Sequence, residues 1–169
     1  MKAWLGLGSN LQNPAAQLTL AIRRLSDADG IEVLRSSSLY RTPPWGDELQ
    51  DDFINAAVQI ETSLAPLALL HVLQSIEDAM GRKRNDRRWG PRLIDLDLLL
   101  FGGQQSQSAE LELPHPRMHE RAFVLLPLIE LEPTLEIPGR GKLKSLLSKI
   151  DCSGICRLSE ADSNWPGNE

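Results

Sequence analysis

The sequence has few cysteines, few aromatic residues and no long apolar segment. Its 169 residues include two cysteines, Cys152 and Cys156, and 5% aromatic residues. A closed zinc site needs four ligands, and no further His or Cys lies near this pair, so we expect no zinc centre there. Two free thiols in a reducing compartment are the simpler interpretation, and a disulfide between them is the alternative. The longest apolar run, residues 96–101 with one acid inside it, is too short to cross a bilayer.

Signatures of three other protein classes are also missing. Residues 1–20 lack the uninterrupted apolar stretch of a signal peptide, so we expect a cytoplasmic protein. The glycine turn at residues 6–10 is not followed by Gly-Lys-Ser/Thr and is not a Walker loop. The net charge is −5, so the protein as a whole is not built to coat nucleic acid.

What is present indicates an ordinary globular chain. Hydrophobic residues make up 41% and charged residues 24%, and the length suits one domain with a substantial core. We expect a single domain over residues 1–150. From Ser159 onward the residues are mostly Glu, Asp, Ser, Asn, Pro and Gly, so we expect residues 151–169 to be a poorly ordered tail.

Hydrophobic periodicity predicts the order strand, helix, strand, strand, helix, strand. The expected strands are residues 2–8, 31–40, 53–61 and 93–101, and the expected helices are 14–27, capped by Ser9 or Asn10, and 65–83. A polar hairpin over 104–116, a partly helical segment over 117–131 and a short helix within 142–150 would follow. The order matches an α+β fold, the ferredoxin-like α/β sandwich, with helices on one face of a mainly antiparallel sheet and an added C-terminal hairpin and helices. The other face of the sheet would be partly open or covered by the later segments.

The sharpest chemical signal is the pair Asp95 and Asp97. The two acids stand two residues apart on a predicted strand, so both carboxylates project from one face. Ile94, Leu96 and Leu98 would point to the opposite face, toward the helices. Two adjacent like charges repel each other unless a cation binds between them, and Mg²⁺ suits one or two carboxylates completed by water and phosphate. The alternative is a pair of solvated acids on an edge strand.

Residues 82–92 form a positive patch on an acidic protein, with six cations and one acid. A positive loop beside an acidic pair is what a nucleotide–magnesium complex needs, because the cations contact phosphate oxygens and the acids contact the metal. A solvated loop paired with surface acids is the alternative. Trp89 is costly to expose, so it would either cover a flat group or pack in the core.

Asn55 and Phe53 lie on the more polar face of the predicted strand 53–61. An amide and an aromatic ring at this spacing can read and stack on a heterocycle, and a sheet surface without a ligand is the alternative. The paired prolines predict a stiff loop over residues 42–46. His115 stands between two prolines and is held rigidly, either for a turn or for a phosphate contact.

Several motifs together resemble the 6-hydroxymethyl-7,8-dihydropterin pyrophosphokinase family of folate biosynthesis. They are Gly8-Ser9-Asn10-Leu11, Tyr40-Arg41-Thr42-Pro43-Pro44, Asn55-Ala56-Ala57, Arg82-x-Arg84, Arg88-Trp89-Gly90-Pro91-Arg92, Asp95-Leu96-Asp97 and Pro114-His115. The resemblance covers residues 1–150. It implies a monomer with a ferredoxin-like fold that transfers diphosphate from ATP to the pterin hydroxymethyl group and releases AMP.

The resemblance also implies roles for individual residues. Asp95 and Asp97 would bind two Mg²⁺ ions, and Arg82 and Arg92 would complete the catalytic set. The pterin site would comprise Thr42, Pro43, Pro44, Trp45, Phe53, Asn55, Trp89 and Phe123. The nucleotide site would comprise Gln74, Glu77, Arg84, Trp89, Arg92, Leu98, His115 and Arg121. The chain departs from the family pattern at Trp45, Phe53, Glu110, Glu112 and Pro116; where it has Phe53 the family commonly has Tyr.

The sequence therefore predicts an enzyme with small-molecule substrates and no nucleic-acid or membrane partner. The hydroxymethyl oxygen would attack the β-phosphorus in line, and positioning and electrostatics would supply most of the catalysis. The proton acceptor stays open between Asp97 and a lowering of the hydroxyl pKa by the metal. Two rival functions are a binding module for a small ligand or RNA and a kinase that transfers the γ-phosphoryl group. Two aspartates beside the basic loop would repel RNA, and the kinase would release ADP.

Overall fold

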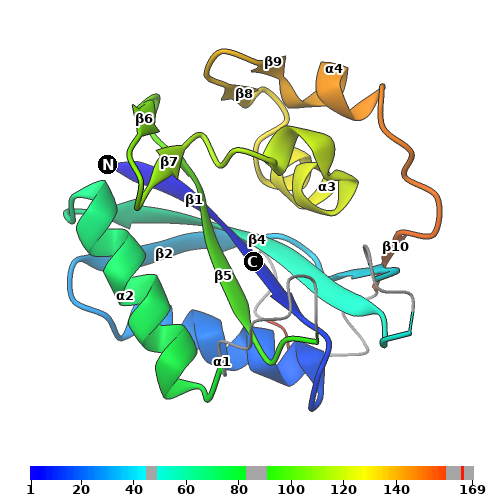
Figure 1. Ribbon diagram of the computed structural model, residues 1–169, viewed down its shortest axis with the longest axis horizontal. Helices are drawn as coiled ribbons and strands as arrows, with labels where there is room; N and C mark the ends of the chain where they lie inside the picture. Colours follow the sequence, from blue (N-terminus) through cyan, green and yellow to red (C-terminus); the bar gives the residue numbers. More distant parts are fainter. Residues whose placement is uncertain (45–48, 83–90, 159–164, 166–169) are drawn as a thin grey trace.

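The computed structural model describes residues 1–44, 49–82, 91–158 and 165. Its centre is a six-stranded antiparallel sheet (Figure 1). The strands are β1 (Lys2–Ser9), β2 (Ile31–Ser36), β3 (Tyr40–Thr42), β4 (Phe53–Thr62), β5 (Asp95–Phe101) and β10 (Cys156–Arg157). β4 pairs with β1, β2 and β3, while β1 also pairs with β5, and β3 also pairs with β10. The predicted strand 31–40 is thus divided between β2 and β3.

Helices α1 (Pro14–Ser26) and α2 (Pro66–Ala79) cover one face of the sheet (Figure 1). The expectation that Ser9 or Asn10 caps the first helix is wrong, because the Asn13 side chain accepts the cap hydrogen bond from the Ala16 amide. Pro14 explains the difference, since proline suits the first helical position and disfavours helical geometry in the residue before it. α2 ends earlier than predicted because Gly81 has a φ of +88°.

The core between the sheet and these two helices has the alternation that the sequence predicts. Ile54, Ala56, Val58 and Ile60 of β4 all pack in it. Ile94, which precedes β5, and Leu96 and Leu98 of β5 pack there too. Each strand therefore turns its intervening residues, the candidate site residues among them, to the opposite face.

The opposite face is covered over part of its area by the later segments (Figure 1). These are the hairpin β6 (Ser106–Gln107) and β7 (Glu112–Leu113), the 3₁₀ turn η1 (Met118–Glu120), α3 (Ala122–Leu131), the hairpin β8 (Glu136–Ile137) and β9 (Gly141–Lys142), and α4 (Leu143–Leu147). Trp4, Leu99, Leu125 and Leu128 belong to the second apolar cluster that forms there. The predicted hairpin at 104–116 and helices within 117–131 and 142–150 are confirmed.

The C-terminal residues contribute to the sheet and to the core. The prediction of a poorly ordered tail over 151–169 falls in large part on residues outside the described ones; within the described part, β10 adds to the sheet and Trp165 is 9% exposed in the core. The polar composition after Ser159 hid one large apolar side chain, Trp165, whose burial removes a large apolar area from water. Among the described residues, no helix has the length and apolar character needed to span a membrane.

Candidate active site

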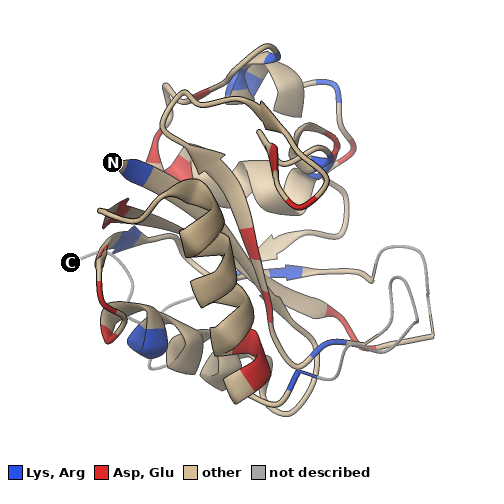
Figure 2. Cartoon of the chain, turned by 60° about the vertical axis from the view of Figure 1, so that its left-hand side comes forward, with Lys and Arg blue, Asp and Glu red and all other residues tan. Residues whose placement is uncertain are grey.

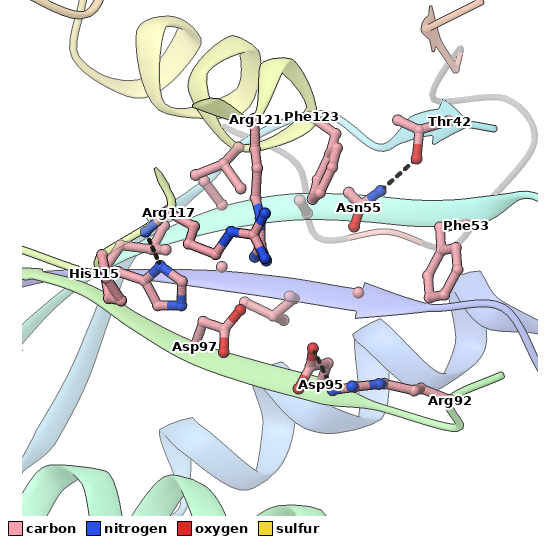
Figure 3. A pocket seen from close by; sticks show the side chains of 18 of the residues that line it. Thr42, Phe53, Asn55, Arg92, Asp95, Asp97, His115, Arg117, Arg121 and Phe123 are labelled. Atoms are coloured by element: carbon pink, nitrogen blue, oxygen red, sulfur yellow. Dashed lines mark hydrogen bonds and ion pairs between the residues drawn. The ribbon is translucent and has the colours of Figure 1, made fainter. Parts of the chain in front are cut away.

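A cavity of about 350 Å³ opens on the sheet face that α1 and α2 leave free (Figure 3). Strands β1, β4 and β5 form its floor, and the segment from His115 to Val124 forms a wall. Its lining comprises Gly6, Leu7, Gly8, Thr42, Pro43, Phe53, Asn55, Ala56, Ala57, Arg92, Asp95, Asp97, Leu99, His115, Pro116, Arg117, Arg121, Phe123 and Val124. The structure thus brings together residues from three predicted groups. They are the acidic pair Asp95 and Asp97, the cation Arg92, and Asn55 and Phe53, which were expected to bind a heterocycle.

Asp95 and Asp97 lie on the same face of β5 and both line the cavity (Figure 3). Burial, and then the neighbouring charge of Asp95, raises the pKa of Asp97 from 3.8 to about 7, although Arg121 and Arg92 oppose the shift. Ionising Asp97 in this site is therefore costly. A divalent cation between the two carboxylates would remove that cost.

The acidic pair fits magnesium better than zinc. Within the described parts of the chain, no three His, Cys, Asp or Glu side chains gather as a metal site. Mg²⁺ does not need such a cage, because it binds through one or two carboxylates and keeps water and substrate phosphates as its other ligands.

Arginines on both sides hold Asp95. Arg82 Nη1 lies 2.9 Å from Asp95 Oδ1, and Arg92 Nη1 lies 3.2 Å from Asp95 Oδ2. The backbone of Arg92 is fixed in turn by Asn10, whose Oδ1 accepts from the Arg92 amide at 2.8 Å. The backbone N–H of Asn10 also donates to the Arg92 carbonyl at 3.1 Å. Sequence reasoning took Asn10 as a helix cap, so its role in placing Arg92 was missed.

Glu77 supports this arrangement from beneath. Its side chain is buried, pairs with Arg82 and accepts from the Leu96 amide at 2.7 Å. Burial raises the pKa of Glu77, while the Leu96 amide and Arg82 act against the rise. Acidic and basic segments consequently meet where the end of α2 approaches the start of β5 (Figure 2). Glu77 thereby anchors Arg82 beside Asp95.

Several residues predicted to contact the nucleotide or the pterin are not among the described residues that line the cavity. Glu77 and Leu98 are 3% exposed and lie on the core side, and Gln74 is part-buried on α2. Leu98 faces the helices because it alternates with Asp97 along β5. Trp45, Arg84 and Trp89 lie outside the described residues. Pro44 is described but does not line the cavity.

Asn55 and Thr42 provide a polar edge at the other end of the cavity. Asn55 Nδ2 donates to Thr42 Oγ1 at 2.7 Å, and the two residues are 7% and 2% exposed. Thr42 was expected in a loop but ends β3, where it pairs with Phe53. Phe53 and Phe123 line the same cavity, so a flat ring can be both stacked on and read from its edge (Figure 3).

Gly8 of β1 touches this polar edge directly. A Cβ atom at Gly8 would lie 2.8 Å from Asn55 Oδ1, closer than carbon and oxygen pack. Only glycine therefore lets the Asn55 amide occupy its position. From the sequence, Gly8 was interpreted as part of a strand-to-helix turn. Its contact with Asn55 depends on the pairing of β1 with β4, in which the two residues lie opposite each other, and the sequence alone does not give that register.

His115 is a neutral hydrogen-bond donor in this cavity. Its Nδ1 accepts from the Arg117 amide at 3.2 Å, which leaves the proton on Nε2. Burial, together with the charge of Arg121, lowers the pKa of His115 from 6.5 to about 4. His115 can therefore donate to a phosphate oxygen without carrying a positive charge.

We expect the His115 imidazole to stay neutral well below neutral pH. The unfolded chain takes up a proton at this residue below about pH 6.5 and the folded chain only near pH 4, so folding stability falls as the pH decreases across that window. The imidazole resonances of His115, followed by NMR from pH 8 to pH 5, should hardly move. A midpoint near pH 6.5 would contradict the assignment, and His115→Gln identifies the resonances.

Comparison with known proteins decides the family. Residues 4–133 match the family model for 7,8-dihydro-6-hydroxymethylpterin-pyrophosphokinase (HPPK). A 2-amino-4-hydroxy-6-hydroxymethyldihydropteridine pyrophosphokinase of Methylorubrum extorquens is 52% identical over 157 residues, which is 93% of this chain and 98% of the relative. The protein of the same name from Haemophilus influenzae is 42% identical over 157 residues, with the same coverage of 93% and 98%.

The chain belongs to the HPPK family.

The fold of the family is seen in a larger solved protein. The Plasmodium falciparum HPPK-DHPS wild type with pteroate matches with a TM-score of 0.69 at 17% identity. The match covers 88% of this chain and 42% of that one, so the chain spans less than half of the solved protein. This likeness supports a mixed α/β fold with an antiparallel sheet. As pyrophosphokinases, HPPK enzymes use ATP as a co-substrate and Mg²⁺.

Proposed function

We propose that this chain transfers diphosphate from ATP to the hydroxymethyl group of 6-hydroxymethyl-7,8-dihydropterin, a step of folate biosynthesis, and releases AMP. The observation that carries the proposal is a single cavity with two chemical ends. One end has the Asn55–Thr42 edge and two phenylalanines for a heterocycle. The other has Asp95 and Asp97 with the cations that a triphosphate needs.

Asp95 and Asp97 are the residues that would hold Mg²⁺, and we propose two ions. Bound there, Mg²⁺ would neutralise phosphate charge and polarise the phosphoryl oxygens. Arg82 and Arg92, which contact Asp95 in the structure, are long enough side chains to turn from the carboxylate to phosphate oxygens. Asn10 and Glu77 keep both arginines beside the site during that exchange.

The remaining cavity residues would position the two substrates. Asn55 and Thr42 read the pterin edge, and Phe53 and Phe123 stack on its ring, which aims the hydroxymethyl oxygen toward the acidic end. The Nε2–H group of His115 would donate a hydrogen bond to a phosphate oxygen, and Arg121 adds positive charge on the same wall. In-line alignment and neutralised charge would then supply most of the rate enhancement.

Two structural classifications belong to the same proposal. The strand order β2-β4-β1-β5 with α1 and α2 on one face supports the ferredoxin-like sandwich. We also propose that residues 1–150 form a single domain and that the protein acts as a monomer, as the resemblance to the family implies.

The nucleotide product tests the proposal. The protein is incubated with ATP, Mg²⁺ and the hydroxymethyldihydropterin, and the nucleotides are separated by ion-exchange chromatography. We expect AMP in equal amount to the pterin diphosphate, and none without the pterin. ADP would indicate transfer of the γ-phosphoryl group, and absence of turnover would indicate a binding module; either result rejects the proposal.

A further inference from the structure

The C-terminal residues form a clasp on the pterin end of the cavity. We define the clasp as residues 154–158 and Trp165. Cys156 and Arg157 pair with Arg41 and Tyr40 of β3, and the Leu158 amide donates to the Leu39 carbonyl at 2.8 Å (Figure 1). β3 has only three residues, and its other neighbour is β4. The clasp therefore supplies the second hydrogen-bonding partner of the strand that ends at Thr42.

Arg157 ties this strand pair to α3 through Glu130. Glu130 accepts from the Ser38 amide at 2.9 Å, the Ser38 hydroxyl at 2.8 Å and the Tyr40 hydroxyl at 2.7 Å. Arg157 lies 3.3 Å from the Glu130 carboxylate and donates to the Ser38 hydroxyl at 2.8 Å. Burial acts to raise the pKa of Glu130, but these donors outweigh it and hold the pKa below its ordinary value.

This cluster joins the two walls between which the pterin would lie. α3 carries Phe123 near its start and Glu130 near its end, and β3 carries Tyr40 and Thr42. A fixed contact between Glu130 and Tyr40 therefore sets the separation of the Phe123 ring from the Thr42–Asn55 edge.

Trp165 supports β4, a strand that forms part of the cavity floor, through Ser37. Its indole Nε1 donates to the Ser37 carbonyl at 2.7 Å. Ser37 exchanges two hydrogen bonds with Ala57: its amide donates to the Ala57 carbonyl at 2.9 Å, and its hydroxyl accepts from the Ala57 amide at 2.9 Å. Ala57 lines the cavity two residues from Asn55. A buried tryptophan thus fixes the strand that presents the pterin-reading amide.

Gly154 completes the contact at the cavity rim. It has a φ of +79°, and a Cβ atom there would lie 2.9 Å from Cγ of Pro43, which lines the cavity. The clasp thus meets the pterin wall at Pro43, at Tyr40 and at Ser37.

We propose that Arg157 and Trp165 are positioning residues for the pterin substrate, acting through β3 and β4 rather than by touching it. The inference rests on the proposed function for the identity of the ligand. Within the described parts of the chain, the side chains of Arg157 and Trp165 reach Ser38, Glu130 and Ser37, which lie away from Asp95 and Asp97 at the acidic end of the cavity. Loss of the clasp should therefore weaken pterin binding while leaving the affinity for ATP nearly unchanged.

Three variants separate this role from a merely stabilising one. Trp165→Phe keeps an aromatic ring and removes the N–H donor, Arg157→Gln removes the charge, and Trp165→Ala removes the anchor. Cys156→Ser is the matched control, since its exposed side chain belongs to the same strand and β10 keeps its backbone pairing. We expect Trp165→Ala to raise the KM for the pterin about tenfold, because small misplacements of a positioning wall have large effects. Trp165→Phe and Arg157→Gln should raise it by smaller factors.

The readout is the pterin KM against the ATP KM, together with pterin binding measured by calorimetry in the presence of Mg²⁺ and a non-transferable ATP analogue. An unchanged pterin affinity in every folded variant would overturn the inference, as would an equal rise for both substrates. If Trp165→Ala does not fold, Trp165→Phe and Arg157→Gln decide the question. If the wild-type protein binds the pterin but forms no AMP, the proposed function is rejected. The inference about the clasp is then still tested, because calorimetry compares pterin binding between wild type and variants.

Discussion

Replacing Asp97 with asparagine should lower turnover about a thousandfold while the fold survives. The variant keeps the shape of the side chain but loses a carboxylate that faces the cavity beside Asp95. Groups that stabilise charge in phosphoryl transfer contribute on the order of 10³-fold or more to the rate. The measurement is the initial rate of AMP formation at saturating ATP, Mg²⁺ and pterin. Near-normal turnover would contradict the role of Asp97.

The same change should not destabilise the protein. The folded pKa of Asp97 is about 7 against 3.8 for the free side chain, so the folded state loses stability as the pH rises from about 4 to 7. At neutral pH the ionised carboxylate is thus a cost that asparagine removes. Without metal, we expect the variant to melt at the same or a higher temperature, with about 2–4 °C for each kcal/mol gained.

Asp29→Asn is the matched control for this variant. It makes the same chemical change at an exposed position between α1 and β2. Turnover and melting temperature should both stay at the wild-type values. A lower melting temperature or a lost circular-dichroism signal for Asp97→Asn would mean that the carboxylate is structural.

Replacing Gly8 with alanine should raise the pterin KM by about 10- to 100-fold. The new Cβ would lie 2.8 Å from Asn55 Oδ1, and Asn55 is held on its other side by Thr42. The Asn55 amide must therefore shift. Polar groups of a bound pterin would then lose their hydrogen-bond partner, which weakens the binding free energy by about 1–3 kcal/mol. The KM for ATP should change much less, because among the described residues the new Cβ would come within 4 Å of Asn55 and not of Asp95, the partner of Gly8 on β5.

Gly103→Ala is the control for the glycine substitution. A Cβ atom at Gly103 would meet nothing within 4 Å. This variant should keep both KM values. A wild-type pterin KM in Gly8→Ala would show that Asn55 does not read the pterin, and an equal rise for ATP would indicate a general disturbance of the sheet.

The fold and the acidic end of the site were accessible from the sequence because they follow from short-range patterns. Alternation along residues 53–61 and 93–101 sufficed to place Asn55, Asp95 and Asp97 on the face away from the helices, and the structure confirms that placement. Two residues of spacing on a strand fix a side-chain face whatever the rest of the chain does. The family followed from motifs that combine these positions.

The missed features depend on contacts between distant parts of the chain. Gly8 meets Asn55 only through the β1–β4 register, and Asn10 meets Arg92 across 82 positions of sequence. Trp165 stands in a segment whose composition is polar, and nothing local indicates that it reaches Ser37. Glu77 was predicted to contact the nucleotide, and its second role, as a buried anchor between Arg82 and the Leu96 amide, was missed. Helical periodicity alone does not distinguish these two roles.

The central claim is that Asp95 and Asp97 hold the metal of the nucleotide beside the pterin cavity. Electron paramagnetic resonance of Mn²⁺, a substitute for Mg²⁺, tests it most directly. The protein is titrated with Mn²⁺ in the presence of an ATP analogue that cannot transfer its diphosphate, and protein-bound manganese is measured for wild type, Asp97→Asn and Asp29→Asn. We predict tight binding by wild type and Asp29→Asn, and at least about a tenfold loss of affinity in Asp97→Asn. Equal manganese affinity in all three proteins would contradict the account.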